Sequence, residues 1–191
     1  MQPRDWQLLS EAIEFYNNRC GYEFVSLPWY VHGVSVEATA HYSWISNISG
    51  QYSKSLVGSA EQAFIDWDAQ DALGKGRFVA CTPCFRMHDE GRSPFHQGCF
   101  MKVELYSNMP DGSHFEHLMA DAKEFFKHVG ADVVEEVALD DGTFDLTLNG
   151  IEIGSYGART FHHPVHDRTI HWSYGTGIAV PRFTLAEAHH A

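Results

Sequence analysis

A charged loop lies between two apolar segments in the middle of the sequence, and its residue types could bind a nucleotide. Residues 78–85 and 100–105 have the alternation and the β-rich composition of strands. The loop begins at Arg86, and the second segment carries Phe100 and Glu104. A guanidinium can bind a phosphate, an aromatic ring can stack on a base, and a carboxylate can bind an ammonium group. The alternative is an ordinary β-hairpin whose charged loop is solvated.

Two carboxylates flank a second predicted hairpin. Asp145 and Glu152 are seven positions apart, and Asn149-Gly150 between them is a strong signal for a two-residue turn. Across a tight hairpin, two carboxylates can converge on one hard cation that also binds phosphate oxygens. The alternative is a pair of ordinary exposed carboxylates on neighbouring strands.

The cysteines could also bind a metal. Cys81-x-x-Cys84 could be a redox pair or half of a metal site, and Cys99 with His88 or His96 could complete a zinc tetrad. We favour a simpler interpretation, in which the first two cysteines are small core residues of a strand.

A histidine-rich segment, residues 159–172, precedes the last part of the chain. Clustered histidines can bind metal, but the spacing of these four repeats neither as a helix nor as a strand. We therefore predict a loop that could cover the site. The four histidines are His162, His163, His166 and His171.

The elements that must position these groups begin with an amphipathic helix over residues 4–19. Its apolar residues are Trp6, Leu9, Ile13 and Tyr16, and Gly21 is a suitable residue to end it. A strand over residues 22–27 follows. Residues 32–54 show no clear period, and the polar residues 66–75 predict a connection.

A second helix and a run of strands follow the central hairpin. Ser113 and Glu116 form a capping box, and an apolar helical face then extends to Gly130. Its members are Phe115, Leu118, Met119, Ala122, Phe126 and Val129. Strands are predicted over residues 132–139, 143–148 and 151–156. A strand meander after a helix favours an α+β fold, with an antiparallel sheet flanked by helices.

Composition narrows the class of protein. The 191 residues suit one domain, and 44% hydrophobic residues indicate a globular chain. The net charge of −12 argues against a broad nucleic-acid-binding surface, because such surfaces neutralise phosphates. No apolar run is long enough to span a membrane, and the N-terminus is unlike a signal peptide, so we expect a cytoplasmic protein.

Three segments, taken in order, resemble the motifs of class II aminoacyl-tRNA synthetases. The sequence Cys-Thr-Pro-Cys-Phe-Arg, a loop and His-Gln-x-x-Phe-x-Lys-Val-Glu, within about residues 78–106, resembles motif 2 of the seryl type. The helix and strand of residues 5–31 look like motif 1. Residues 174–188, with Gly175, Gly177 and Arg182, look like motif 3. Residues 56–64 resemble the seryl-type Thr-Ala-Glu segment, with Ser59 in place of the Thr and Glu61 as the Glu.

The resemblance implies an antiparallel catalytic fold, with ATP and Mg²⁺ as cofactors and a homodimer formed through motif 1. In this family an amino-acid carboxylate attacks the α-phosphate of ATP to give an aminoacyl-adenylate. Carried over, Arg86 binds the α-phosphate and the carboxylate, and Phe100 stacks on adenine with Arg182 on its other face. Glu61 and Glu104 would bind the amino group of the substrate, and Ser59 and Ser155 would also contact the substrate. Gly175 and Gly177 would allow the nucleotide to approach the chain. Asp145 and Glu152 would bind the magnesium ion.

The sequence also departs from the family. His88 stands where motif 2 has a Glu, for which Glu90 could substitute, and His96 stands where seryl enzymes usually have an Arg. No tRNA-binding domain is recognised, which together with the charge argues against tRNA charging by this chain alone. Our first hypothesis is amino-acid activation with transfer to a carrier protein or small molecule. The alternatives are a non-catalytic paralogue that binds amino acid or nucleotide and regulates a partner, a truncated tRNA-charging enzyme, and an amide-forming paralogue that uses ammonia.

Overall fold

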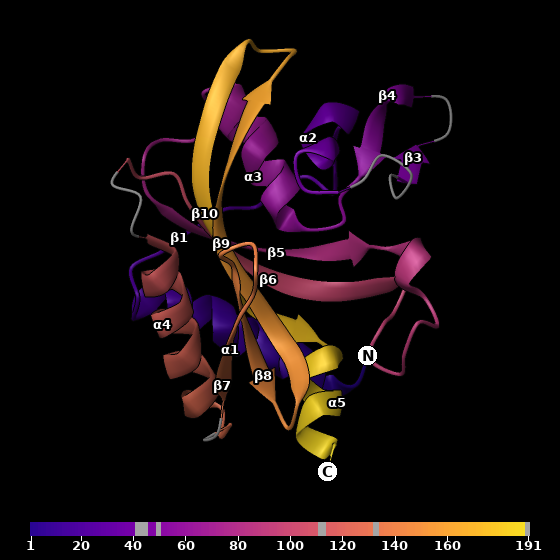
Figure 1. Ribbon diagram of the computed structural model, residues 1–191, viewed down its shortest axis with the longest axis vertical. Helices are drawn as coiled ribbons and strands as arrows, with labels where there is room; N and C mark the ends of the chain where they lie inside the picture. Colours follow the sequence, from indigo (N-terminus) through magenta and orange to yellow (C-terminus); the bar gives the residue numbers. More distant parts are fainter. Residues whose placement is uncertain (41–45, 49–50, 111–113, 132–133, 190–191) are drawn as a thin grey trace.

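A computed structural model describes residues 1–40, 46–48, 51–110, 114–131 and 134–189. Its main element is a curved seven-stranded sheet in which β1 is parallel to β5 and the other neighbours are antiparallel (Figure 1). In spatial order the strands are β1 (Glu23–Phe24), β5 (Arg77–Phe85), β6 (Cys99–Ser107), β10 (Arg168–Val180), β9 (Ile151–His163), β8 (Phe144–Leu148) and β7 (Glu135–Ala138). The predicted α+β class is confirmed, although β1 is shorter than the strand predicted over residues 22–27.

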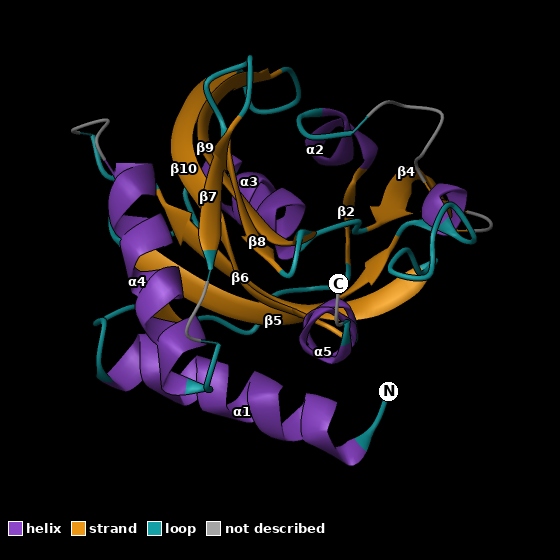
Figure 2. Ribbon diagram, turned by 60° about the horizontal axis from the view of Figure 1, so that its bottom comes forward, coloured by secondary structure: helices purple, strands orange, loops and turns teal. Residues whose placement is uncertain are grey.

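Three helices cover the outer face of the sheet: α1 (Pro3–Asn18), α4 (His114–His128) and α5 (Arg182–Ala188) (Figure 2). Alternate residues of β6, such as Val103 and Leu105, point into this layer, because side chains alternate along a strand. The predicted apolar face of α4 is confirmed, while Ser113 of its capping box lies outside the described residues. The helix predicted over residues 4–19 is also confirmed, but Trp6 is 56% exposed and does not join the buried face.

The inner face packs against α3 (Ala60–Ala69), beside α2 (Gly33–Glu37). A small sheet adjoins them, in the order β2 (Tyr30–His32), β4 (Gln51–Leu56), β3 (Ser46–Ile48). The ring of Phe64 stacks on Tyr106 with centroids 4.8 Å apart. The connection predicted over residues 66–75 was wrong at its start, because α3 continues to Ala69. Two aspartates that look solvent-facing in sequence are buried there: Asp66 accepts from Ser35, and Asp68 accepts from Tyr106.

The histidine-rich segment is not a loop. Residues 159–172 form the distal half of a long β9–β10 hairpin, whose turn occupies only residues 164–167. Arg159 is opposite Trp172 in this ladder, so both lie on the same face. The predicted Asn149-Gly150 turn is confirmed, and both of its residues have positive φ, at 52° and 74°. Within the described residues, no helix is long and apolar enough to cross a membrane.

Candidate active site

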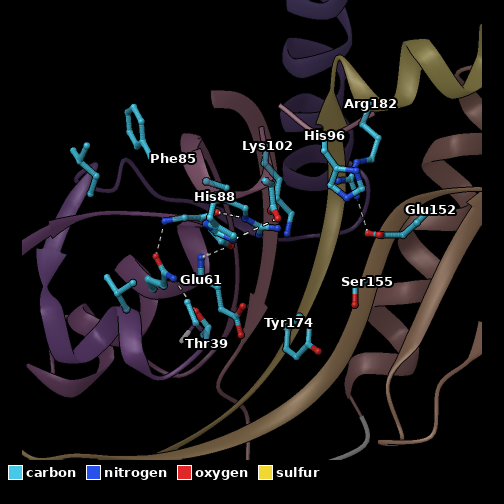
Figure 3. Close-up of a pocket in the computed structure, with 18 of the residues that line it drawn as sticks. Thr39, Glu61, Phe85, His88, His96, Lys102, Glu152, Ser155, Tyr174 and Arg182 are labelled. Carbon is cyan, nitrogen blue, oxygen red and sulfur yellow. Dashed lines mark hydrogen bonds and ion pairs between the residues drawn. The ribbon is translucent and has the colours of Figure 1, made fainter. Parts of the chain in front are cut away.

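A cavity of about 330 Å³ opens on the inner face of the sheet, between β5, β6, β9, β10 and α3 (Figure 3). Six predicted site residues line it: Ser59, Glu61, Arg86, Glu152, Ser155 and Arg182. The cavity also contains Lys102, Arg159 and Arg92, so among its described residues five Lys or Arg side chains lie beside three acidic ones. This local excess of positive charge contrasts with the acidic chain as a whole.

Strand geometry explains how motif 2 supplies this cavity. Phe100, Lys102 and Glu104 alternate along β6 with residues that enter the outer helix layer. Across the ladder with β5, Cys84 is opposite Phe100 and Thr82 is opposite Lys102. The period of two that predicted these strands therefore also assigns their polar residues to the inner face.

The first buried carboxylate of the site is Glu104. It is fully buried, and the Nζ atom of Lys102 donates to it at 2.9 Å. Ser59 donates its hydroxyl to the same carboxylate and also caps α3 by accepting from the backbone N–H of Glu61. Lys102 lines the cavity and Glu104 does not. Glu104, predicted to bind the substrate amino group, thus already holds an ammonium from its own strand.

The second buried carboxylate is Glu61, which lies early in α3. Its Oε1 atom accepts from Arg159 at 3.0 Å and from the indole of Trp172 at 2.8 Å, and its Oε2 atom accepts from Arg159 at 3.2 Å. The Arg159 guanidinium stacks over Tyr174, 4.1 Å from the ring centroid. Burial raises the pKa of Glu61, and Arg159 opposes this shift.

Sequence reasoning missed Arg159 and Trp172. The segment that contains them was interpreted as a loop because its histidines obscure the alternation of buried and exposed positions. The signal that could have found them is the period of two at Arg159, Phe161 and His163, which places these residues on one face.

The outer end of the cavity contains Arg182, Glu152 and Ser155. Arg182, the first residue of α5, pairs with Glu152 at 3.1 Å, as Figure 3 shows. Asp145 does not line the cavity but is directly opposite Ser155 in the β8–β9 ladder. Burial raises the pKa of Asp145, and the Glu152 carboxylate raises it further.

The motif 2 loop is only partly as predicted. Arg86 donates its Nε–H to the carbonyl of Gly58 at 2.9 Å, and its guanidinium lies 5.4 Å from the Phe100 ring centroid. Glu90 is exposed and lies outside the cavity, whereas His88 lines it. The substitution of Glu90 for the missing motif 2 Glu is therefore not supported by this geometry.

His96 and Arg92 also line the cavity from this loop. His96 Nδ1 is 2.6 Å from the Ser93 hydroxyl, and Arg92 pairs with Asp89 at 2.9 Å. The loop therefore presents both a histidine and an arginine where one phosphate-binding arginine was expected.

The glycines of motif 3 lie where bulky core side chains pack. Gly175 and Gly177 belong to strand β10. A Cβ atom at Gly175 would lie 2.7 Å from the Tyr156 ring, and one at Gly177 would lie 2.8 Å from the Tyr16 ring. These glycines make room for core tyrosines, and neither lines the cavity.

The cysteines are free. Cys81 and Cys84 belong to one extended strand, where an odd spacing points them to opposite faces about 10 Å apart along the strand. Cys99 is exposed. Among the residues that the structure describes, no group of three or more His, Cys, Asp and Glu side chains is arranged to hold a metal ion.

Comparisons with known proteins find similarity in structure and not in sequence. No protein-family model and no curated protein matches the sequence. The chain superposes on seryl-tRNA synthetase from Pyrococcus horikoshii complexed with ATP with a TM-score of 0.73 and 19% identity, covering 95% of this chain and 49% of that one. The cytoplasmic serine–tRNA ligase from Naegleria fowleri in complex with AMP gives 0.71 and 19%, covering 94% and 46%.

A pyrrolysyl-tRNA synthetase from Desulfitobacterium hafniense is similar as well, with a TM-score of 0.74 and 16% identity, covering 98% of this chain and 68% of that one. The chain spans about half the length of the two seryl enzymes. In all three comparisons the match extends over nearly the whole of this chain. The chain therefore has the fold of the class II aminoacyl-tRNA synthetase catalytic domain.

Proposed function

We propose that this chain uses ATP to activate an amino acid as an aminoacyl-adenylate and passes the aminoacyl group to an acceptor other than tRNA. The observation that carries the proposal is the single cavity in which Arg86, Lys102 and Arg182 lie beside Glu61 and Glu152. Such a cavity can bind the polyphosphate of ATP beside a small polar acid.

In the proposed reaction, a carboxylate oxygen of the amino acid attacks the α-phosphorus of ATP. The bond from that phosphorus to its bridging oxygen breaks, and pyrophosphate leaves with the electron pair. Negative charge accumulates on the transferred group, and cations held in place before the reaction stabilise it. Arg86, anchored on the carbonyl of Gly58, is suited to the α-phosphate and the reacting carboxylate. Arg182 is suited to the far end of the triphosphate, and Phe100 is assigned to the adenine.

Asp145 and Glu152 fit a magnesium ion by their chemistry, since both are carboxylates on adjacent strands, with Glu152 in the cavity and Asp145 opposite Ser155, which also lines it. Such an ion would neutralise phosphate charge and orient the leaving pyrophosphate. Ser155 is opposite Asp145 and hydrogen-bonds its carboxylate, and Arg182 pairs with Glu152. These two neighbours keep the carboxylates oriented before any nucleotide binds.

The net charge of −12 supports a carrier protein or small molecule as acceptor, because binding tRNA depends largely on neutralising its phosphates. We also propose a homodimer through the motif 1 region, where Trp6 and Trp29 are each 56% exposed. Sedimentation equilibrium tests this: the unmodified chain should sediment as a dimer, and Trp6→Glu with Trp29→Glu should give a monomer. An unmodified chain that is monomeric at all concentrations would exclude this dimer.

Amino-acid-dependent ATP–pyrophosphate exchange tests the activity. The full panel of amino acids is assayed with the unmodified chain and with Arg86→Ala and Arg182→Ala, each expected to lower exchange by about 10²- to 10³-fold. Arg4→Ala is the matched control, because Arg4 is exposed and pairs with Glu187 away from the cavity. Folded protein that exchanges with no amino acid would exclude the proposal.

One observation favours a second candidate function, a non-catalytic paralogue that binds amino acid or nucleotide and regulates a partner. His88 lines the cavity where the family has a Glu, and Glu90 lies outside it. If exchange is absent while ATP or an amino acid raises the melting temperature, this function replaces the first. Charging of tRNA, a further alternative, is measured with the same amino acid panel and total tRNA.

A further inference from the structure

The inner end of the cavity is paired in charge before any substrate enters. Two carboxylates and two cations are found there: Glu61, Arg159 and Lys102 line the cavity, and Glu104 is the buried partner of Lys102. Each carboxylate is bonded to one of the cations, so the formal charge of the four side chains is zero. A site that binds only the ammonium group of a substrate would be expected to have an excess of negative charge. This end therefore lacks the imbalance that would favour an amino acid with an uncharged side chain.

The two oxygens of Glu61 differ in what they can still accept. Oε1 accepts from both Arg159 and Trp172, at 3.0 and 2.8 Å, whereas among the described residues Oε2 accepts from Arg159 alone, at 3.2 Å. A carboxylate has about four lone-pair positions, so Oε2 retains room for another donor. Glu61 lines the cavity, which makes this oxygen the point at which a substrate ammonium can bind.

Arg159 has donors to spare as well. In the described part of the chain, all of its hydrogen bonds come from Nη1, and its guanidinium plane stacks over Tyr174. Nε and Nη2 remain for another acceptor, and a planar guanidinium edge matches a carboxylate in a two-bond geometry. The stacked ring and Glu61 fix the plane, so little side-chain entropy remains to be lost on binding.

Resting on the proposed function, we propose that the amino acid activated here is acidic. Its ammonium binds Oε2 of Glu61, its second carboxylate binds the free edge of Arg159, and its reacting carboxylate binds Arg86. Such a substrate brings one positive and one negative charge to an inner end that itself contains both in equal number. Arg159 is then the residue that determines specificity, and Lys102 supports it by neutralising Glu104.

The test compares isosteric pairs in ATP–pyrophosphate exchange: L-aspartate with L-asparagine, and L-glutamate with L-glutamine. We expect kcat/KM for one acid to exceed that of its amide by at least about a hundredfold, because the amide replaces the charged, two-bond partner of the guanidinium edge with a single neutral oxygen. Exchange with neutral amino acids but with neither acid would overturn the inference and leave the proposed function intact. Exchange with no amino acid at all would overturn the proposed function itself.

Arg159→Lys and Arg159→Met test the role of this residue. Lys keeps a charge for Glu61 but lacks the planar fork, so we expect a 10- to 100-fold rise in KM for the acidic substrate, with the KM for ATP unchanged. Met also leaves Glu61 unpaired, and its folding is checked by circular dichroism. If Arg159→Lys retains the full preference for the acid over its amide, Arg159 is not the determinant and the inference is wrong.

Discussion

The two ends of the cavity differ in how their charges are held. At the inner end, Glu104 is fully buried, and its partner Lys102 has a side chain that is only 10% exposed. At the outer end, the side chain of Glu152 is 44% exposed, and its partner Arg182 is 17% exposed. The inner pair is enclosed by the protein, whereas the outer pair is accessible to solvent through Glu152.

This difference suits the two tasks that the proposed function requires of the cavity. A polyphosphate with its magnesium is large and strongly hydrated, so the groups that bind it need access to solvent. A small acid is selected by matching donors and acceptors, so the groups that bind it gain from a dry and rigid environment. The same burial makes the inner pair much more costly to break than the outer one.

Removing one cation from each end tests whether the two ends differ in this way. Lys102→Met leaves the buried Glu104 carboxylate uncompensated, and we expect the free energy of unfolding to fall by about 3–5 kcal/mol. Arg182→Met removes a partner from a half-exposed carboxylate and should cost less than about 1 kcal/mol. Urea unfolding at pH 7 measures both variants.

Lys102→Met with Glu104→Gln is the control for this prediction. The amide keeps an acceptor for the Ser59 hydroxyl but carries no charge, so most of the lost stability should return. Equal losses from Lys102→Met and Arg182→Met would contradict the distinction between the two ends.

The sequence predicted the β8–β9 turn and the central strands well, for a physical reason. Asp145 and Glu152 flank a two-residue turn whose type depends on local residues alone. The β8–β9 ladder then places the two residues on adjacent strands. The strands of motif 2 alternate with period two, which fixes both their conformation and their facing. Local signals of this kind survive in the fold unchanged.

The inner end could not be predicted in the same way. Glu61 and Arg159 are 98 positions apart, and their contact depends on how α3 packs on the distal β9–β10 hairpin. No local pattern encodes that packing. The histidines of residues 159–172 also obscured the alternation that would have predicted the hairpin. The motif 3 glycines could not be interpreted from the sequence either. Glycine is required there because the rings of Tyr16 and Tyr156 pack against these positions.

The second prediction concerns the outer carboxylates. Asp145→Asn should weaken binding of ATP in the presence of Mg²⁺ by roughly tenfold, or about 1.4 kcal/mol, and should change binding of ATP without Mg²⁺ much less. Burial and then Glu152 raise the pKa of Asp145. A proton therefore competes with the cation at a higher pH than for an ordinary aspartate, and magnesium-dependent binding by the unmodified chain should weaken first as the pH falls.

Isothermal titration between pH 7.5 and 5 measures this effect. Asp141→Asn is the matched control, since Asp141 lies in the exposed turn between β7 and β8 and outside the cavity. If Asp145→Asn and Asp141→Asn bind ATP equally well with and without Mg²⁺, Asp145 has no part in holding the cation.

The smallest expected effect is at His163, beyond the inner end, where the tip of the β9–β10 hairpin meets α2. His163 is fully buried, and its Nε2 atom is 3.1 Å from the Ser35 hydroxyl, whose proton is given to Asp66. Burial, His166 and His32 lower the pKa of His163, against a smaller opposing effect of Asp66. The unfolded chain thus binds a proton at this position more readily than the folded chain, so stability is retained above the unfolded pKa of about 6.5 and lost as pH falls towards the folded pKa.

Urea midpoints at steps from pH 7.5 to 5 should fall less steeply for His163→Gln than for the unmodified chain, with the exposed His171→Gln as control. Parallel slopes for all three proteins would mean that the buried ring takes up its proton as easily as a solvated one, and that the dry environment of the inner end does not extend to the tip of the hairpin.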